Sequence, residues 1–124
     1  MKKFPLSKEK RLSSNKQFKA ILAHGHSARN GLLILYMSEN DCGYPRLGVS
    51  VGKIHGNAIV RNRLKRLLRE VFRQSQGGIP ASFDYLLLVS HKKGTENQPT
   101  FEQLKKSFVT LINSILNKSI SREK

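Results

Sequence analysis

The residues best placed to do chemistry in this sequence are the cations of residues 60–73. This stretch holds five arginines and one lysine, with a single carboxylate among them. A guanidinium group can grip two phosphate oxygens at once or stack on a base, so this excess of arginine suits a folded RNA. Arg61, Lys65 and Arg69 recur every four residues, and like charges at this spacing destabilise an isolated helix by roughly a few tenths of a kcal/mol per pair. The stretch therefore predicts a helix that binds a polyanion.

A helical wheel separates the polar residues of this stretch from the apolar ones. At 100° per residue, with Arg61 at zero, the polar set falls between about 0° and 140° and the apolar set between about 240° and 340°. The two sets are predicted to lie on opposite faces. The polar set is Arg61, Asn62, Lys65, Arg66, Arg69 and Arg73, and the apolar set is Val60, Leu64, Leu67, Leu68 and Val71. A solvated polar face is the simpler alternative, but charges of one sign favour anion binding.

Side chains suited to acid–base or metal chemistry are scattered. The histidines, His24, His26, His55 and His91, show no ligand spacing on a shared helical face, and the first two are expected in a solvated loop. The acidic residues form no carboxylate cluster of the kind that a two-metal nuclease needs. The single cysteine, Cys42, excludes an internal disulfide and a cysteine-based zinc site within one chain. We expect no catalytic residue, metal or cofactor on the protein itself.

Composition points to the same class of partner. The 124 residues suffice for one domain, and 23 Lys+Arg against 8 Asp+Glu give a formal net charge of +15. A small domain with this charge usually binds nucleic acid or an anionic membrane surface. The longest apolar runs are strand-sized, so neither a membrane span nor an export signal is predicted. We expect a single RNA-binding domain over residues 1–124, located in the cytoplasm and not bound to a membrane.

Helices and strands are predicted to alternate along this domain. A capping box at Ser14–Gln17 opens the first helix, Asn57 caps the second, and a capping box at Thr100–Gln103 opens the last. The order α-β-β-α-β-α predicts an α+β sandwich with one small sheet. The predicted segments are a basic extended arm at 1–12, helices from 15 to Gly25, over 58–73 and from 101, strands at 31–38, 47–52 and 83–90, and a flexible tail at 119–124.

The strand predicted at 47–52 alternates strictly between large apolar and small or polar residues. Its apolar residues are predicted to face a core, and Arg46, Gly48, Ser50 and Gly52 to face the other way. That second face is nearly bare. It either lets a ligand approach the backbone closely or lies beneath a covering helix, and the alternation leaves both open.

Two aromatic residues could belong to the same surface. Phe18, at helical spacing from Ile21 and Leu22, could be core or could stack on a ligand. Tyr36 alternates away from its apolar neighbours Leu35 and Met37, and a phenol suits a site with one wet edge. Tyr36 is therefore the better candidate for contact with a ligand.

The segment from Lys53 to Glu70 resembles the protein subunit of bacterial ribonuclease P. The hallmark of that family is a Gly-Asn-Ala-x-x-Arg-Asn-Arg-x-Lys-Arg-x-x-Arg run, which residues 56–69 match throughout. The resemblance continues upstream through Lys10–Leu12, Phe18, Leu35–Tyr36 and Arg46–Val51 and covers nearly the whole chain. It implies a protein, inactive alone, that assists a catalytic RNA in the endonucleolytic removal of the 5′ leader from precursor tRNA, with Mg²⁺ at the catalytic centre of the RNA. It also implies a left-handed crossover between parallel strands around the basic helix.

The resemblance further implies two binding surfaces. The basic helix and the loop before it would face the catalytic RNA, through Asn57, Arg61, Asn62, Arg63, Lys65, Arg66 and Arg69. A cleft between the first helix and the open sheet face would hold the single-stranded leader, through Phe18, Tyr36, Arg46, Ser50 and Lys53. Leu22 and Ile54 depart from the family, which often carries a second aromatic and a second lysine at these positions. A structural RNA-binding protein of the ribosomal type is the alternative function.

Overall fold

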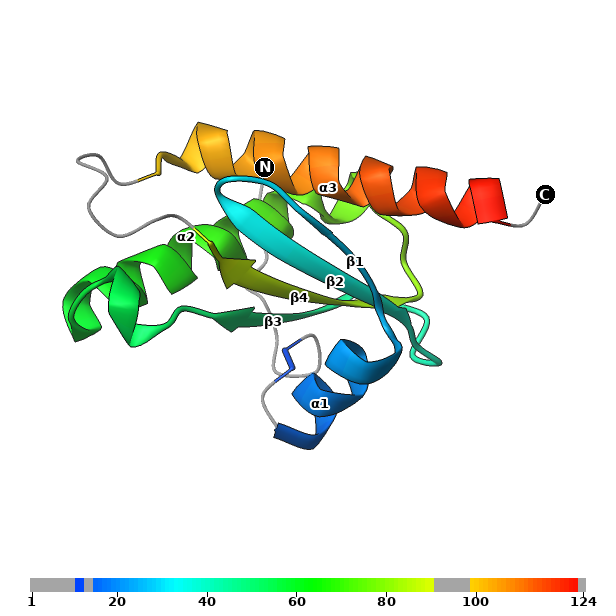
Figure 1. The fold of residues 1–124 in the computed structure, drawn as a ribbon, viewed down its shortest axis with the longest axis horizontal. Coiled ribbons are helices and arrows are strands. Elements are labelled where there is room, and N and C mark those ends of the chain that lie inside the picture. Colours follow the sequence, from blue (N-terminus) through cyan, green and yellow to red (C-terminus); the bar gives the residue numbers. More distant parts are fainter. Residues whose placement is uncertain (1–10, 13–14, 91–98, 123–124) are drawn as a thin grey trace.

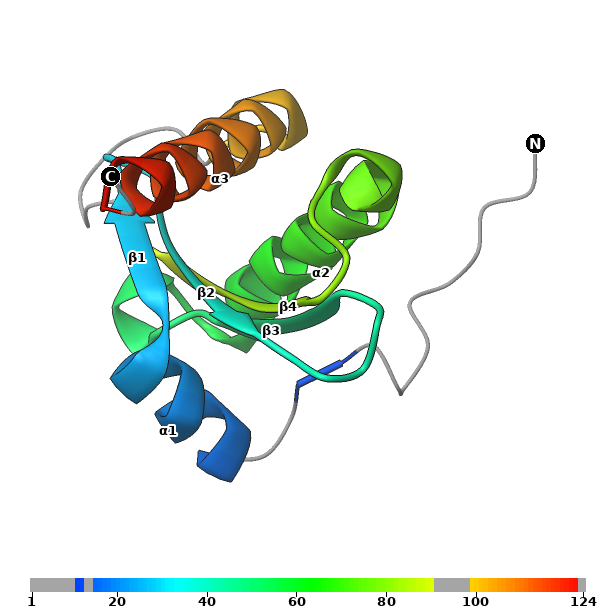
Figure 2. The same ribbon diagram turned by 90° about the vertical axis from the view of Figure 1, so that its right-hand side faces the viewer.

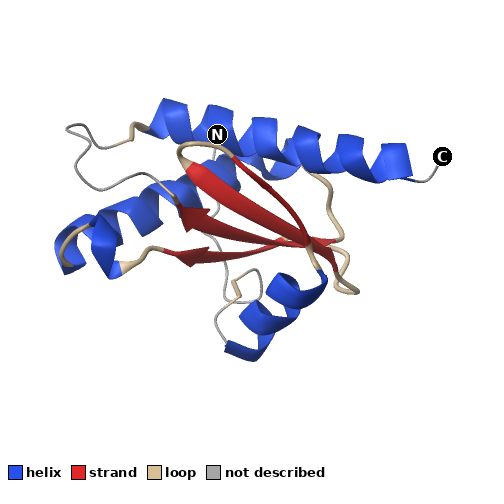
Figure 3. Cartoon of the chain, in the orientation of Figure 1, coloured by secondary structure: helices blue, strands red, loops and turns tan. Residues whose placement is uncertain are grey.

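A four-stranded sheet forms the centre of the molecule, with two long helices on one face and a short helix on the other (Figure 1). The computed structural model describes residues 11–12, 15–90 and 99–122. The elements, distinguished by type in Figure 3, are α1 (Asn15–His24), β1 (His26–Arg29), β2 (Leu33–Glu39), β3 (Arg46–Ser50), the 3₁₀ turn η2 (Lys53–His55), α2 (Ala58–Ser75), the 3₁₀ turn η3 (Gln76–Gly78), β4 (Phe83–Val89) and α3 (Phe101–Arg122). The α+β class predicted from the sequence is confirmed.

The sheet has one strand more than the sequence predicts. Its order is β1-β2-β4-β3, and β1 pairs antiparallel with β2 from His26 opposite Met37 to Arg29 opposite Ile34. The expected solvated loop at His26 is therefore wrong. Three of the four residues of β1 are exposed and only Ala28 is buried, so this short edge strand carries almost none of the alternation that identifies a strand in a sequence.

The main core lies between the sheet and the two helices α2 and α3. Leu33, Leu35 and Met37 of β2 are fully buried on this face, as the alternation predicts. The capping box of α3 is also confirmed, because Thr100 and Gln103 exchange hydrogen bonds of 2.9 and 3.2 Å between each backbone N–H and the other side chain. The buried apolar side chains of α3 are Leu104, Phe108, Leu111, Ile112 and Ile115.

The basic helix α2 connects the two parallel strands of the sheet. β3 and β4 pair in parallel, from Arg46 opposite Asp84 to Ser50 opposite Leu88. In Figure 2 β1 lies at the left end of the sheet, so the order β1-β2-β4-β3 places β4 to the left of β3. Both strands run away from the viewer, and the chain passes from β3 through α2 above the sheet to β4. This path is anticlockwise, so the crossover is left-handed, as the resemblance implies and against the usual preference of such connections.

Both ends of the described chain contain regular structure that the sequence does not predict. Residues 1–10 of the expected arm lie outside the described residues, but Arg11 forms a parallel bridge with Leu47, and Leu12 is buried beneath the sheet. The Leu12 N–H donates to the Leu47 carbonyl at 2.7 Å. At the other end, α3 continues to Arg122 and takes in most of the expected tail, because no proline or glycine interrupts residues 101–122.

Candidate nucleic-acid interface

Among the polar residues of α2 that the wheel groups together, and those near them, Asn62, Arg63 and Arg66 are exposed, while Arg61, Lys65 and Arg69 are half-buried. The two faces of the wheel are therefore not strictly opposite. The reason is Phe72, which is fully buried although the wheel places it among the cations. The core side of α2 is consequently wider than the apolar spacing predicts, and one row of cations borders the sheet.

The start of α2 is held by two local features. The Asn57 side-chain oxygen accepts a hydrogen bond from the Val60 N–H at 3.0 Å, which confirms Asn57 as the cap. Gly56 has φ of 135°, and a Cβ atom there would lie 2.9 Å from the Cβ of Val60. Only glycine fits this position without strain. The turn therefore fixes the direction in which α2 leaves the sheet and presents its cations.

Two of the cations on α2 have partners within the chain. The Arg61 Nε donates to the Gly56 carbonyl at 3.2 Å, which orients its guanidinium group along the start of the helix. Arg73 forms an ion pair with Glu70 one turn before it. Glu70, the single carboxylate of this stretch, therefore neutralises one of its cations.

The sheet face beneath α1, called here the α1 face, carries three rows of side chains across the strands. The middle row contains Tyr36, Leu86 and Gly48 on adjacent strands. Phe18 of α1 covers Gly48, and Ile21 of α1 is buried with Leu86. At Gly48 the bare face therefore lies under a helix, the second of the two alternatives that the sequence leaves open.

A second row of the α1 face remains partly exposed. Arg29, Ile34, Leu88 and Ser50 follow one another across β1, β2, β4 and β3, and the last three are half-buried. The exposed Lys53 begins the turn η2, three residues after Ser50. All five expected leader residues thus lie on or beside the α1 face with part of their surface accessible. We call four of them, Phe18, Tyr36, Ser50 and Lys53, the leader surface.

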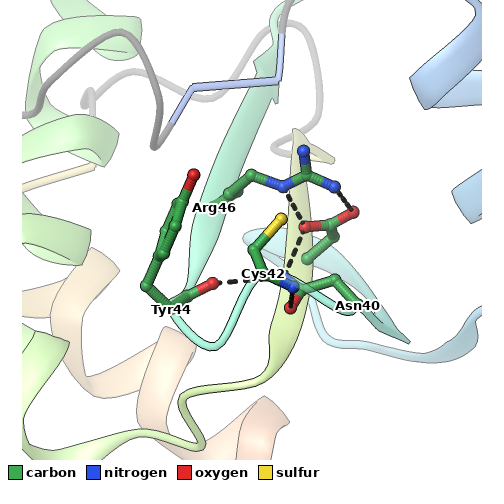
Figure 4. Close-up of polar contacts among 5 residues, drawn as sticks. Asn40, Cys42, Tyr44 and Arg46 are labelled. Carbon is green, nitrogen blue, oxygen red and sulfur yellow. Dashed lines mark hydrogen bonds and ion pairs between the residues drawn. The ribbon is translucent and has the colours of Figure 1, made fainter.

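The fifth expected leader residue, Arg46, is committed to an internal partner (Figure 4). Its Nε and Nη2 atoms donate to the two carboxylate oxygens of Asp84 at 2.7 and 2.8 Å. These hydrogen bonds raise the pKa of the Arg46 guanidinium group. Asp84 also accepts a hydrogen bond from the Asn40 side chain at 2.8 Å, and that side chain donates to the Tyr44 carbonyl at 3.2 Å. Arg46 therefore anchors the turn between β2 and β3, and its charge is neutralised.

Arg69 faces a hollow at the outer edge of β3. The hollow has a volume of about 290 Å³ and is lined by Arg11, Leu12, Phe18, Leu47, Val49 and Arg69. Burial, and the nearby charge of Arg11, lower the pKa of the Arg69 guanidinium group. The hollow thus joins one residue expected to face the catalytic RNA, Arg69, to one expected to contact the leader, Phe18.

The histidines do not form a metal-binding group in the part of the chain described by the structure. His24 and His26 line a second hollow, of about 510 Å³, with Glu39 and the apolar Ile115 and Leu116. Within residues 11–12, 15–90 and 99–122 no group of three or more histidine, cysteine or acidic side chains could hold a metal ion. His91 lies outside the described residues.

Two residues of the site are not predicted by the sequence. Arg11 falls in the segment expected to be an extended arm. The one signal in the sequence that could have indicated a fixed position for Arg11 is its place next to an apolar residue, Leu12, which is buried. Asp84 carries a clearer signal, because a carboxylate inside an apolar strand needs a partner. The sequence alone does not identify Arg46 as that partner, since the two residues lie 38 positions apart.

A basic α+β domain with cations along one helix and aromatic side chains on a sheet face defines a protein that binds nucleic acid. The family model described as Ribonuclease P matches residues 6–116. The chain belongs to this ribonuclease P protein family. Its members are subunits of an endoribonuclease holoenzyme and assist an RNA in maturing the 5′ ends of tRNA, so the partner of this chain is an RNA.

Relatives and solved structures agree with this assignment. The chain is 40% identical over 88 residues to the ribonuclease P protein component of Syntrophus aciditrophicus, covering 71% of this chain and 74% of the relative. It is 36% identical over 107 residues to that of Clostridium kluyveri, covering 86% and 88%. The ribonuclease P protein from Thermotoga maritima superposes with a TM-score of 0.75 at 33% identity, covering 85% of this chain and 96% of that one. These matches exclude the ribosomal alternative.

Proposed function

We propose that this chain binds the catalytic RNA of ribonuclease P through α2 and holds the 5′ leader of precursor tRNA on the leader surface. One observation carries the proposal. Tyr36 and Phe18 are both half-buried on the α1 face, and Lys53 is exposed at the edge of that face. The cationic helix lies across the β3 edge from this face. Proteins commonly bind single-stranded RNA through aromatic side chains, on which the bases stack, and cations, which contact the phosphates.

The leader surface suits a single strand of any sequence. Bases can stack on Tyr36 and on the accessible part of Phe18, and each such stack contributes about 1–3 kcal/mol without requiring a particular base. Lys53 is free to contact the phosphates, and Ser50 offers a hydroxyl group beside them. Arg46 is not included in this surface, because Asp84 occupies its forked donors.

The second surface, on α2, supplies the contacts to the catalytic RNA. It consists of Asn57, Arg61, Asn62, Arg63, Lys65, Arg66 and Arg69. Neutralisation of phosphates by these residues would offset the repulsion between the catalytic RNA and precursor tRNA. Bond cleavage, with its Mg²⁺, is assigned to the RNA, and no residue of this chain is given a catalytic role. The complex is expected in the cytoplasm, and among the described helices none combines the length and apolarity needed to cross a bilayer.

The proposal is tested by comparing precursor and mature tRNA as ligands of the holoenzyme assembled with Tyr36→Ala. Because mature tRNA has no leader, the substitution should weaken binding of the precursor by about tenfold, equivalent to about 1.4 kcal/mol, and leave mature tRNA unchanged. Tyr36→Phe, which keeps the stacking face, should retain nearly full affinity.

The matched control is Tyr44→Ala, because Tyr44 lies in the turn between β2 and β3, outside the leader surface, and alanine keeps the backbone carbonyl that accepts the hydrogen bond from Asn40. It should leave both affinities unchanged. Equal reductions for precursor and mature tRNA with Tyr36→Ala would refute the leader surface and leave the protein as a scaffold for its RNA. Circular dichroism of each variant establishes that the fold is retained.

A further inference from the structure

The hollow at the outer edge of β3 brings two guanidinium groups and an aromatic ring together from three separate parts of the chain. Arg11 comes from the N-terminal segment, Phe18 from α1 and Arg69 from α2. The position of Arg11 is fixed, because its backbone bridges Leu47 and the next residue, Leu12, is buried. The hollow is thus built from ordered elements.

We propose that Arg11 and Arg69 together hold one backbone phosphate of the precursor tRNA leader in this hollow. The leader then passes around the outer edge of β3, from the side of α2 to the leader surface beneath α1. This inference rests on the proposed function, because it assumes that a leader is bound on that surface. It adds Arg11 to the residues that recognise the substrate and gives Arg69 a second role.

The charges around the hollow favour an anion. None of its described lining residues carries a carboxylate, and the two ion pairs of the described chain are formed by other arginines. Burial first, and then repulsion by the Arg11 guanidinium group that shares the hollow, lower the pKa of Arg69. A phosphate between them would remove this repulsion and accept charge-assisted hydrogen bonds from both forks.

The shape and the neighbours of the hollow favour a nucleotide within a single strand. Its volume, about 290 Å³, accommodates a phosphate with part of the attached nucleoside. Phe18 lines the hollow and also covers Gly48 on the α1 face, so a base next to the bound phosphate can stack where the leader surface begins. A phosphate of the catalytic RNA has the same chemistry, and the experiment must distinguish the two sources.

The experiment uses holoenzyme assembled at saturating protein, with Arg11→Gln, Arg69→Gln or both. Each single variant should weaken binding of precursor tRNA by about fivefold and leave mature tRNA unchanged. Since both residues grip one phosphate, the double variant should bind little more weakly than the weaker single variant. The control is Lys105→Gln with Lys106→Gln, which removes two cations from α3 on the opposite face of the sheet and should change neither affinity.

The bound phosphate is located with precursors that carry one neutral methylphosphonate at successive leader positions. One position should weaken binding to the wild-type holoenzyme by about fivefold and have no further effect with Arg11→Gln. If every position costs the same with and without Arg11, the clamp is refuted. Weakening by Arg11→Gln that is equal for mature and precursor tRNA would assign the phosphate to the catalytic RNA and also overturn the proposal. If the effect of Tyr36→Ala remains confined to the precursor in either case, the leader surface itself stands.

Discussion

Phe18 lies against Gly48 so closely that a Cβ atom at residue 48 would be 2.7 Å from the Phe18 Cε1 atom and 3.1 Å from the Leu12 Cβ atom. Glycine is therefore required on β3 by the approach of α1 and not by the backbone conformation. The position of Phe18, an aromatic residue of the leader surface, therefore depends on the absence of a side chain at residue 48 of β3.

Gly48→Ala should consequently displace Phe18. We expect a decrease of about 1–3 kcal/mol in the free energy of unfolding, measured by urea denaturation, together with weaker binding of precursor tRNA. Gly31→Ala is the control, because a Cβ atom there would meet nothing within 4 Å. Full stability of Gly48→Ala would mean that α1 can shift without cost.

Arg46→Ala should act on stability and not on the salt dependence of RNA binding. The substitution leaves the carboxylate of Asp84, only 8% exposed, without its strongest partner. We expect a decrease of about 2–3 kcal/mol in the free energy of unfolding, and a less than additive effect when Asp84→Ala is combined with it. A variant of normal stability with weakened leader binding would instead place Arg46 on the phosphates.

The triple variant Arg61→Ala, Lys65→Ala, Arg69→Ala should weaken binding to the catalytic RNA and reduce its salt dependence. For each phosphate that is no longer neutralised, the slope of log affinity against log salt should fall by about 0.7–0.9. Affinity is measured by titration at several salt concentrations. Weaker binding with an unchanged slope would show that these residues act through the fold.

Single substitutions of His24, His26, His55 and His91 by alanine should leave the cleavage step of the holoenzyme within about a few-fold of wild type. The reason is that the described histidines form no metal-binding group, and bond cleavage is assigned to the RNA. The measurement is single-turnover cleavage of precursor tRNA at saturating holoenzyme. A decrease of several orders of magnitude with intact assembly would place chemistry on the protein.

The elements that the sequence predicts correctly are those whose signals are local. The cap at Asn57 and the capping box at Thr100 depend on neighbouring residues only, and both are confirmed. The predicted polar face of α2 is slightly too wide, because Phe72 packs at its border against Tyr85 and Phe108, which belong to other elements.

The remaining features depend on partners distant in sequence. The β1 strand forms because it can pair with the edge of β2. Its own four residues show almost no alternation of apolar and polar side chains that would identify a strand in the sequence. The pairing of Arg46 with Asp84 and the hollow shared by Arg11 and Arg69 each require the tertiary fold. Residue type can indicate that such a group needs a partner, but only the arrangement of the strands identifies it.

The position of β4 has a consequence for the synthesis of this protein. β4 lies between β2 and β3 and yet follows both in the chain, so neither strand has its inner neighbour until residue 89 has left the ribosome. A nascent chain that ends before β4 can form the hairpin of β1 and β2 but leaves two apolar strand edges open, and such edges promote aggregation. The sheet is therefore completed only after β4 has been synthesised, and premature termination before residue 83 yields a product in which β2 and β3 lack the neighbour that they share.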